Sequence, residues 1–547
     1  MIDTVHAAFA ATAARTPQAE FLFTEEVTAR AYGIPPGALA WGEAAGKVDS
    51  LRRAYAEAGY GHGHRVGLLL DNRPDFLLHW FALNAVGASV VPINGEMRSA
   101  ELTYLIGHSE IELAVCLPQR MPHLQAAAAA AGRPFATVDA ALSGGLPRAG
   151  SLAPHAAEPI GADTECALLY TSGTTGRPKG CMLDNAYFLR AGEWYAGLDG
   201  VCSFRRDQER LITPLPLNHV NAMAFSTMVV VVAGGCLVQL DRFHPGTWLQ
   251  SAREGRATIA HYLGVMPAML LAAPPSPSDR DHGIRWGFGA GVDRKNHAPF
   301  EARFGFQLVE AWAMTETGAA ACVMANHEPR HVGTSCFGRR EPFVDIRLVD
   351  EAGSDVGDDL PGELLVRSAG SDPRRHFFRG YLKDEAATRE AWTDDWFHTG
   401  DIVRRDGQGN FYFVDRKKNV IRRSGENISA VEVESVLNQH PAVKAGAVAA
   451  TPDPLRGDEV LACIVLRESV DAGSTASAAY QTLAASIVDH ALAQLAYYKA
   501  PGYVAFVAAL PLTASQKIQR GELRELALRL PGEPNCVDTR AMKKRQA

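Results

Sequence analysis

The sequence lacks the patterns that mark disulfide-stabilised, nucleic-acid-binding or secreted proteins. Its nine cysteines are an odd number without a C-x-x-C pair, which favours free thiols in a reducing compartment over a disulfide framework or a zinc site. The net charge of −7 argues against general binding to nucleic acid or to membrane surfaces. A secretory signal has a basic segment followed by an apolar stretch, and this pattern is missing from the N-terminal residues MIDTVHAAFAATAARTPQAEF. We therefore expect a cytoplasmic protein.

A membrane-spanning pattern is also missing. The most apolar stretch, Met223–Leu240, contains Ser226, Thr227 and the Gly234–Gly235 pair, so it predicts a buried helix and strand. With 47% hydrophobic and 21% charged residues, the composition is that of an ordinary globular protein. The 547 residues predict two to four structural units at roughly 100–200 residues each.

Short apolar runs alternate with helical segments in the first part of the chain. Val66–Leu70 and Ser89–Ile93 are predicted strands, and Asp75–Val86 between them is a predicted helix. Such a βαβ unit requires parallel strands. The same rhythm returns at Glu112–Cys116 and Cys166–Tyr170, which predicts an α/β fold with helices packed on largely parallel sheets.

The pattern changes after about Val414 to a compact αβ arrangement. We therefore expect a large N-terminal domain at 1–417 and a small C-terminal domain at 418–547. The boundary falls in a short basic stretch, Arg416–Lys418.

The strongest chemical signal is the segment Tyr170–Gly180, YTSGTTGRPKG, which follows the apolar run ALLY. Glycines allow a ligand to approach the backbone, and successive N–H groups with Ser and Thr hydroxyls form an anion cradle. Lys179 adds a positive charge. For a generic loop of this composition a flexible turn is the commoner interpretation, and the Walker A spacing is absent. Phosphate binding therefore needs support from the rest of the chain.

That support comes from a resemblance. The segment resembles the phosphate-binding loop of the adenylate-forming superfamily, which includes acyl-CoA synthetases, luciferases and nonribosomal peptide adenylation domains. Six further segments follow in that family's order, namely Pro214–His219 (PLPLNH), Gly289–Val292 (GAGV), Ala311–Gly318 (AWAMTETG), Trp396–Asp401 (WFHTGD), Asp415–Glu434 (DRKKNVIRRSGENISAVEVE) and Leu510–Arg520 (LPLTASQKIQR). The resemblance covers nearly the whole chain.

The resemblance implies a large domain of packed mixed sheets with helices and a small, mobile α+β domain. It implies an AMP-forming acyl-CoA synthetase that uses ATP, Mg²⁺ and coenzyme A. Its partners are a small carboxylic acid, ATP and CoA, and we expect neither nucleic-acid binding nor a membrane span. Dimers are common among such enzymes, so a homodimer is one expected assembly.

Individual residues also make chemical sense in these roles. Glu316 offers a carboxylate to Mg²⁺, a hard cation that prefers oxygen ligands, although alone it is equally a surface glutamate. We expect Asp401 on a short glycine-flanked turn, where its carboxylate could accept hydrogen bonds from two ribose hydroxyls. Considered alone, the aspartate of a T-G-D sequence is more often a turn residue or a helix cap. Trp312 offers a flat face to a purine, or is a core aromatic. The resemblance implies that Lys517, otherwise one more exposed lysine, would stabilise a transition state in which a carboxylate attacks a phosphate.

The resemblance carries these roles to a full set of positions. The catalytic candidates are Lys517, Thr315, Glu316 and His219, and Glu316 is also the metal ligand. The nucleotide and CoA candidates are Thr171, Ser172, Gly173, Thr174, Thr175, Gly176, Lys179, Gly289, Ala290, Gly291, Ala311, Trp312, Ala313, Asp401, Arg416, Gly425 and Glu426.

In the family the small domain rotates between the two half-reactions about a residue that matches Lys418, which exchanges the Lys517 face for the SGEN loop. Several positions depart from the common pattern: Trp312–Ala313 replaces Tyr–Gly, Val292 replaces a frequent proline, and Gln516 replaces the glycine before the lysine. Ala313 narrows one wall of the expected acyl pocket. The SGENIS loop, Gln516 and the tail NCVDTRAMKKRQA are similar to the branch that contains carnitine- and crotonobetaine-CoA ligases.

Other functions stay open at this point. The main alternative is a stand-alone adenylating enzyme that loads a carrier protein, although no carrier domain follows Lys517 in the sequence. A luciferase-like oxygenase has no feature in its favour. A nucleotide-binding regulator without catalysis would lack Lys517, Glu316 or Asp401, and all three are present. Residue identities do not name the acid.

Overall fold

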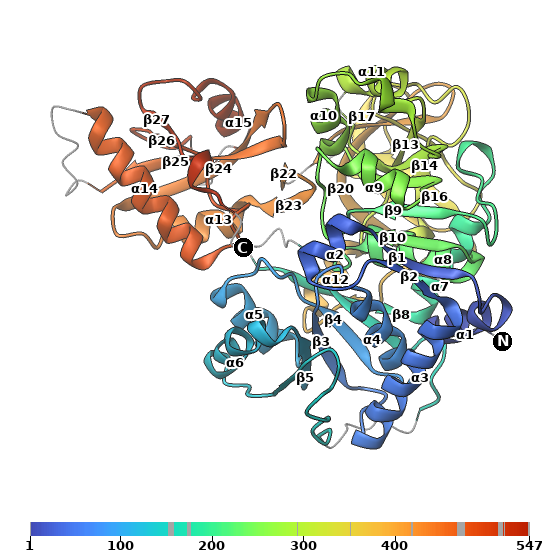
Figure 1. The fold of residues 1–547 in the computed structure, drawn as a ribbon. Coiled ribbons are helices and arrows are strands. Elements are labelled where there is room, and N and C mark those ends of the chain that lie inside the picture. The colour runs from blue at the N-terminus through green and yellow to red at the C-terminus, as the bar shows by residue number, and fades with distance from the viewer. Residues whose placement is uncertain are drawn as a thin grey trace. The chain divides into compact units, whose positions relative to one another are not determined.

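The computed structural model describes residues 2–150, 158–171, 177–292, 294–350, 352–416, 420–467, 476–511, 518 and 520–544. The chain forms two compact units, each described by itself (Figure 1). Unit 1 consists of Met1–Gly95, Ile106–Tyr170 and Gly180–Asp415. Unit 2 consists of Glu96–Leu105, Thr171–Lys179 and Arg416–Ala547.

The predicted βαβ segment is confirmed in a mostly parallel sheet of unit 1. In chain order its strands are β3 (Arg65–Leu69), β4 (Ser89–Pro92), β5 (Leu113–Cys116), β6 (Ala136–Val138), β7 (Glu165–Thr171), β8 (Lys179–Asp184) and β18 (Gly380–Tyr381), with the spatial order β18-β8-β7-β4-β3-β5-β6. Strands β3 and β4 pair in parallel, and α4 (Pro74–Ala85) connects them. Pro74 suits the first helical position, where no backbone donor is needed.

A second sheet of unit 1 supplies the parallel strands that matter most for function. Its strands are β1 (Glu20–Thr24), β2 (Gly37–Ala40), β9 (Arg210–Thr213), β10 (Cys236–Gln239), β11 (Ile259–Leu263), β12 (Trp286–Ala290), β13 (Gln307–Trp312) and β14 (Val323–Met324), in the order β14-β13-β12-β11-β9-β10-β1-β2. The inner strands from β13 to β1 are all parallel. The apolar stretch Met223–Leu240 contributes α8 and β10, as predicted.

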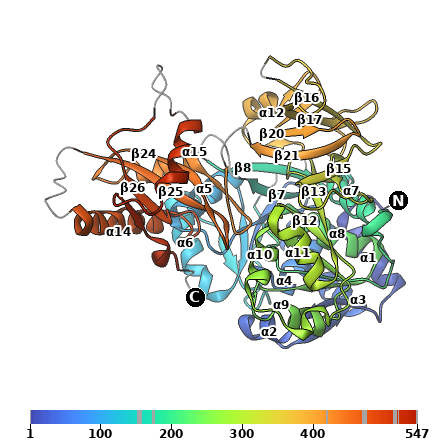
Figure 2. The same cartoon turned by 90° about the horizontal axis from the view of Figure 1, so that it is seen from above.

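The third sheet of unit 1 is antiparallel and lies beside β13 through β15 (Figure 2). It contains β15 (Cys336–Arg339), β16 (Val344–Val349), β17 (Pro361–Ser368), β20 (Trp396–Arg405) and β21 (Asn410–Arg416), with the short β19 (Trp392–Thr393) paired to β20.

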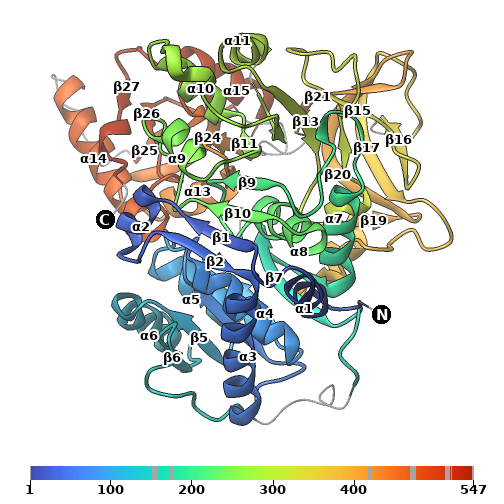
Figure 3. The ribbon, with the colours of Figure 1, turned by 45° about the vertical axis from the view of Figure 1, so that its right-hand side comes forward.

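Helices cover and connect these sheets. They are α1 (Val5–Arg15), α2 (Glu26–Tyr32), α3 (Trp41–Ala58), α6 (Met121–Ala130), α7 (Asn185–Ala196), α8 (Thr227–Ala233), α9 (Trp248–Glu254), α10 (Val265–Ala272), α11 (Arg294–Phe304) and α12 (Glu385–Ala391), in addition to α4. Helix α5 (Ser99–Ser109) begins in unit 2 and ends in unit 1. A π-helical turn, η4 (Asn221–Ser226), directly precedes α8. Helices α7 and α8 lie side by side, and α1 packs against both (Figure 3).

One continuous apolar core holds unit 1 together. It joins side chains from all three sheets and includes the fully buried Trp41, Trp80, Trp248 and Trp286. Burying side chains of this size contributes most of the favourable free energy of folding.

Unit 2 has the α+β character that the resemblance implied. Its strands are β22 (Val420–Arg423), β23 (Glu426–Ser429), β24 (Val443–Asp453), β25 (Gly457–Leu466), β26 (Tyr503–Phe506) and β27 (Cys536–Asp538), and its helices are α13 (Ala430–Leu437), α14 (Ala476–Gln494) and α15 (Arg520–Arg529). Two apolar clusters of its own fill the space between sheet and helices. Within the residues that the structure describes, no helix is both long and apolar enough to cross a bilayer.

Candidate active site

Three of the segments singled out in the sequence leave the same edge of one parallel sheet. Pro214–His219 follows β9, Gly291 follows β12, and Ala313–Gly318 follows β13. Between β9 and β12 lies β11, which pairs in parallel with both. In open α/β sheets, ligands bind outside the carboxyl ends of the strands. Residues far apart in the sequence are therefore brought to one edge where a nucleotide and an acid can meet.

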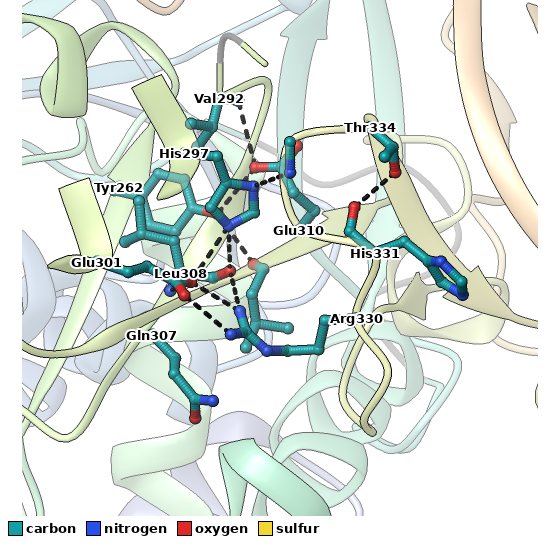
Figure 4. Close-up of polar contacts among 12 residues, drawn as sticks. Tyr262, Val292, His297, Glu301, Gln307, Leu308, Glu310, Arg330, His331 and Thr334 are labelled. Carbon is teal, nitrogen blue, oxygen red and sulfur yellow. Dashed lines mark hydrogen bonds and ion pairs between the residues drawn. The ribbon is translucent and has the colours of Figure 1, made fainter. Parts of the chain in front are cut away.

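A buried carboxylate fixes the turn after β12 (Figure 4). Glu310, on β13, accepts hydrogen bonds from the backbone N–H of Gly291 at 2.9 Å and of Val292 at 3.2 Å. The Tyr262 hydroxyl on β11 donates a third at 2.9 Å. Gly291 adopts φ +81°, a left-handed conformation that favours glycine. Because the turn has this special conformation and charged support, its backbone is held in one position.

Burial raises the pKa of Glu310, and its three donors oppose that rise. A buried carboxylate is tolerated only when it is well hydrogen-bonded, and here two of its donors are backbone groups of the predicted adenine turn. Sequence reasoning missed Glu310. The signal for it was a single acidic residue inside the apolar strand LVEAW.

A second charged cluster contacts the β13 backbone at Leu308 (Figure 4). Arg330 donates to the carbonyl of Leu308 at 3.0 Å and pairs with Glu301 at 2.7 Å. His297 Nε2 also donates to that carbonyl, at 3.0 Å. Burial alone would raise the pKa of Glu301, but hydrogen bonds from His297 and Arg330 lower it to about 2. These contacts stabilise the strand that carries Glu310 and Trp312.

The predicted aromatic and the predicted ribose ligand contact each other. Trp312 Nε1 donates to Asp401 Oδ2 at 2.8 Å, and both side chains are buried, with relative exposures of 6% and 1%. The expectation that Asp401 lies on a short turn is wrong: the segment is part of the ten-residue strand β20. Glycine and threonine suggested a turn, but β20 pairs with β17 through a register shift that accommodates them.

Glu316 lies in the loop after β13 and is also buried, with 6% exposure. Its Oε1 accepts a hydrogen bond from the Tyr381 hydroxyl at 2.9 Å. Burial and the Glu316 charge raise the pKa of Tyr381 far above its usual range, so the phenol keeps its proton and donates. On the preceding residue, the carbonyl of Thr315 accepts from the Tyr187 hydroxyl at 2.8 Å. Two tyrosines from other elements therefore hold this loop.

This loop suits a magnesium ion only in combination with a nucleotide. No group of three or more His, Cys, Asp or Glu side chains that could hold a metal occurs within the described part of the chain. Mg²⁺ keeps several waters and is commonly bound by one or two carboxylates together with substrate phosphates. A single carboxylate, Glu316, already held by a hydroxyl donor, fits that mode.

The other unit 1 candidates lie at the same carboxyl edge. His219 is partly exposed, and its backbone N–H donates to the carbonyl of Pro216 at 3.0 Å. Gly289 and Ala290 are the last residues of β12, and Ala311 is the fifth residue of β13. Ala313, like Ala311, is partly exposed, whereas Trp312 between them is buried.

The remaining candidates belong to unit 2 or lie outside the described residues. Thr171 ends β7, Lys179 begins β8 and Arg416 ends β21. Gly425 forms the turn between β22 and β23 with φ +88°, and Glu426 begins β23. The central loop residues Ser172, Gly173, Thr174, Thr175 and Gly176, the hinge candidate Lys418 and the candidate catalytic Lys517 lie outside the described residues.

Charges buried in unit 2 support the hairpin that carries Gly425. Arg423, at the end of β22, pairs with Glu459 at 2.8 Å, and Lys543 near the C-terminus also contacts Glu459. All three side chains are at most 3% exposed. Burial and the Arg423 charge lower the pKa of Lys543 to about 7. The C-terminal tail, singled out in the sequence only by resemblance, is therefore part of the support for this hairpin.

The bond between Trp312 and Asp401 gives a first prediction. Trp312→Phe keeps an aromatic face but removes the indole N–H, which leaves the buried carboxylate without that donor. A lost partner of this kind costs about 1–3 kcal/mol, so we expect MgATP affinity to fall by about 5- to 150-fold in isothermal titration calorimetry.

The matched control is Trp248→Phe, because Trp248 Nε1 makes no hydrogen bond with any residue that the structure describes. This control should leave MgATP affinity unchanged even if it lowers Tm. An unchanged affinity in Trp312→Phe would show that the bond does not shape the nucleotide site.

A second prediction concerns Glu310. Glu310→Gln has one carboxamide oxygen in place of two carboxylate oxygens, so at least one buried donor loses its acceptor. We expect MgATP affinity to fall by about 5- to 150-fold, from the same cost of about 1–3 kcal/mol. Glu385→Gln, at a glutamate with 92% side-chain exposure, is the control and should bind normally. Normal MgATP binding by Glu310→Gln would contradict the positioning role.

Two family models match the chain. The model of the AMP-binding enzyme matches residues 9–382, and that of the AMP-binding enzyme C-terminal domain matches residues 432–517. The chain is 31% identical to the sulfoacetate–CoA ligase of Cupriavidus necator over 96% of this chain and 98% of that protein. It is 29% identical to a crotonobetaine/carnitine–CoA ligase of Escherichia coli over 87% and 91% of the two chains.

The fold has solved counterparts as well. An o-succinylbenzoate CoA synthetase from Bacillus subtilis superposes with a TM-score of 0.77, covering 95% of this chain and 98% of that one at 22% identity. The expected architecture, a large domain followed by a small one, is thereby confirmed. Since the first model alone spans more than half of the sequence, the chain belongs to the AMP-binding enzyme family.

Proposed function

We infer that the chain is an ATP-dependent acyl-CoA ligase that converts a carboxylic acid to its acyl-adenylate and then to an acyl-CoA. The observation that carries this function is the buried contact between Trp312 and Asp401 at the carboxyl edge of the parallel sheet. It joins an aromatic residue and a carboxylate, the two groups that a purine nucleoside needs. The CoA ligases among the relatives support the same reaction.

In the first half-reaction, a carboxylate oxygen of the acid attacks the α-phosphorus of ATP. The bond from that phosphorus to the bridging oxygen breaks, and pyrophosphate leaves with the electron pair. We propose that the Gly291 turn and Trp312 bind the adenine, that Asp401 accepts from the ribose hydroxyls, and that the phosphate loop with Lys179 binds the phosphates. A Mg²⁺ ion held by Glu316 would supply positive charge to the phosphate oxygens.

In the second half-reaction, the sulfur of CoA attacks the adenylate carbonyl. A carbon–sulfur bond forms, the bond to the AMP oxygen breaks, and the thiol proton is lost to solvent or a base. We propose that the β22–β23 hairpin with Gly425 borders the pantetheine arm, because a side chain at this position would project from the turn. The Arg423, Glu459 and Lys543 contacts keep that hairpin in one conformation.

The acid is proposed to be small and polar. The relatives named above act on sulfoacetate and on crotonobetaine or carnitine, which are short acids with a second polar group. In this chain Ala313 takes the place of a glycine that is common in the family. The methyl group of Ala313 is expected to narrow the acyl pocket. The alternative acceptor of the acyl group is the thiol of a carrier protein. A direct assay with and without CoA distinguishes the two acceptors.

The experiment that tests this function is a pyrophosphate-release screen over a panel of carboxylic acids, with and without CoA. We expect MgATP to yield pyrophosphate and AMP, and added CoA to yield an acyl-CoA that mass spectrometry detects. Formation of ADP and phosphate with every acid would rule out adenylation. Adenylate formation with no acyl-CoA product would favour a carrier protein as the acceptor.

A further prediction separates the two half-reactions. By resemblance, Lys517 contacts the reacting carboxylate and phosphate, where a cation stabilises the transition state by roughly 3–4 kcal/mol. Lys517→Ala should therefore slow adenylate formation by about 10²- to 10³-fold but largely spare thioester formation from supplied acyl-AMP.

The control for this variant is Lys444→Ala, since Lys444 is an exposed residue of β24, and it should affect neither half-reaction. Equal loss of both activities in Lys517→Ala would assign the lysine a structural role.

A further inference from the structure

A histidine buried in unit 1 has no role in the chemistry described so far. His261 lies on β11 and has 0% exposure. Its Nε2 is 2.8 Å from the Tyr195 hydroxyl on α7, and its Nδ1 is 2.7 Å from Asn221 Oδ1 and 2.8 Å from Ser226 Oγ. Three elements, α7, η4 and β11, therefore converge on one imidazole. Burial lowers the pKa of His261 to about 3, so the ring is neutral at neutral pH.

The tautomer of this ring follows from the hydrogen bonds of Tyr195. Burial holds the pKa of Tyr195 well above its usual value, so the phenol keeps its proton. Its hydroxyl has no second hydrogen-bond partner within the described part of the chain. Because buried donors are almost always satisfied, the phenol donates to Nε2. The single ring proton of His261 then lies on Nδ1.

That proton in turn sets the orientation of the Asn221 side chain. Nδ1–H points at the Asn221 side chain, which must present its carbonyl oxygen, Oδ1, as the acceptor. Ser226 also accepts from this ring nitrogen, and its own hydroxyl donates to the Asn221 backbone carbonyl at 3.2 Å. The amide nitrogen of Asn221 is therefore turned away from His261.

The two N–H groups on that nitrogen are available for a ligand. Asn221 is partly exposed, whereas Tyr195, Ser226 and His261 have 0% exposure. Nδ2 makes no hydrogen bond with any other residue that the structure describes. Asn221 is not needed merely to accept the Nδ1 proton of His261, because the Ser226 hydroxyl already contacts the same ring nitrogen. The buried contacts instead orient a donor that faces a partly open position.

The position of this donor relates it to the acid. Asn221 begins η4, two residues after His219, the residue that the resemblance places beside the acyl group. His261 pairs with Phe288 in the β11–β12 register, and two residues later Leu263 pairs with Ala290 at the adenine turn. Asn221 is thus held next to the strand pair that ends at the nucleotide turn. Short π-helical segments such as η4 occur frequently at functional sites.

We propose that Asn221 is a specificity-determining residue whose side-chain amide donates hydrogen bonds to an oxygen on the acyl chain of the acid substrate. The preferred substrates are then acids with a hydroxyl, carbonyl, carboxylate or sulfonate oxygen near the reacting carboxyl group. This proposal rests on the proposed ligase function. A donor fixed in place rejects an acid without the acceptor, since the amide would lose its water and gain no partner.

The test is ATP–pyrophosphate exchange with pairs of acids of matched shape, of which only one member carries the acceptor. Suitable pairs are glycolate with propanoate, 3-hydroxybutanoate with 3-methylbutanoate, and sulfoacetate with 3,3-dimethylbutanoate. The wild-type enzyme should prefer the oxygen-bearing member of at least one pair. In Asn221→Leu the kcat/KM for that member should fall by about 10- to 100-fold, while the apolar member changes by less than about threefold.

Asn221→Asp is a second, more conservative variant, and it replaces Asn221→Leu in the test if that variant does not fold. The aspartate keeps the shape and the acceptor for His261 but has no N–H groups, so the preference for an acid whose extra oxygens can only accept, such as sulfoacetate, should be lost in this variant too. Asn438→Leu, at an exposed asparagine after α13, is the matched control and should retain the wild-type preference. Tm values show whether each variant is folded.

The outcomes separate the two proposals. If no acid supports exchange in the wild-type enzyme, the ligase function fails, and this inference fails with it. If exchange occurs but the wild-type enzyme favours the apolar member of every pair, only the inference is overturned. It is equally overturned if folded Asn221→Leu and Asn221→Asp both keep the wild-type ratio.

Discussion

The hydrogen bond from Trp312 to Asp401 is the contact on which the proposed nucleotide site depends. Trp312 ends a strand of the parallel sheet, and Asp401 lies in the antiparallel sheet, so the bond joins two separately organised layers of unit 1. Both side chains are buried, and a carboxylate in such surroundings requires donors. The same constraint that stabilises the packing of the sheets therefore also fixes the two groups proposed for purine and ribose.

Buried polar groups recur as positioning devices around this contact. Glu310 holds the Gly291 turn, Tyr381 holds Glu316, and His261 holds Asn221. In each case a group that is expensive to bury is satisfied by a partner from another element. Such networks have few alternative arrangements, since a displaced partner leaves an unsatisfied group. The site is consequently built by side chains that need not touch substrate themselves.

Much of the fold could be predicted from local patterns. The strand–helix–strand segment at β3, α4 and β4 was predictable because its two strands are short apolar runs and the segment between them has a helical pattern. The segments GAGV and AWAMTETG were recognisable by their resemblance to motifs of a known family. Their convergence at one sheet edge follows from parallel pairing, which a repeated βαβ rhythm indicates.

Other features could not be predicted because they depend on tertiary contacts. Asp401 was expected on a turn, since pairing between β20 and β17 is invisible in the segment WFHTGD. Tyr195 and His261 are 66 positions apart, and neither is in a motif, so their bond has no sequence signal. The roles assigned to Lys517 and to the phosphate loop still rest on resemblance.

The central claim, adenylation of a carboxylate, is tested most directly with an acid labelled with oxygen-18 in its carboxyl group. Turnover with MgATP and CoA should place one labelled oxygen in AMP and leave one in the acyl-CoA. Label in inorganic phosphate, or AMP without label, would contradict the account.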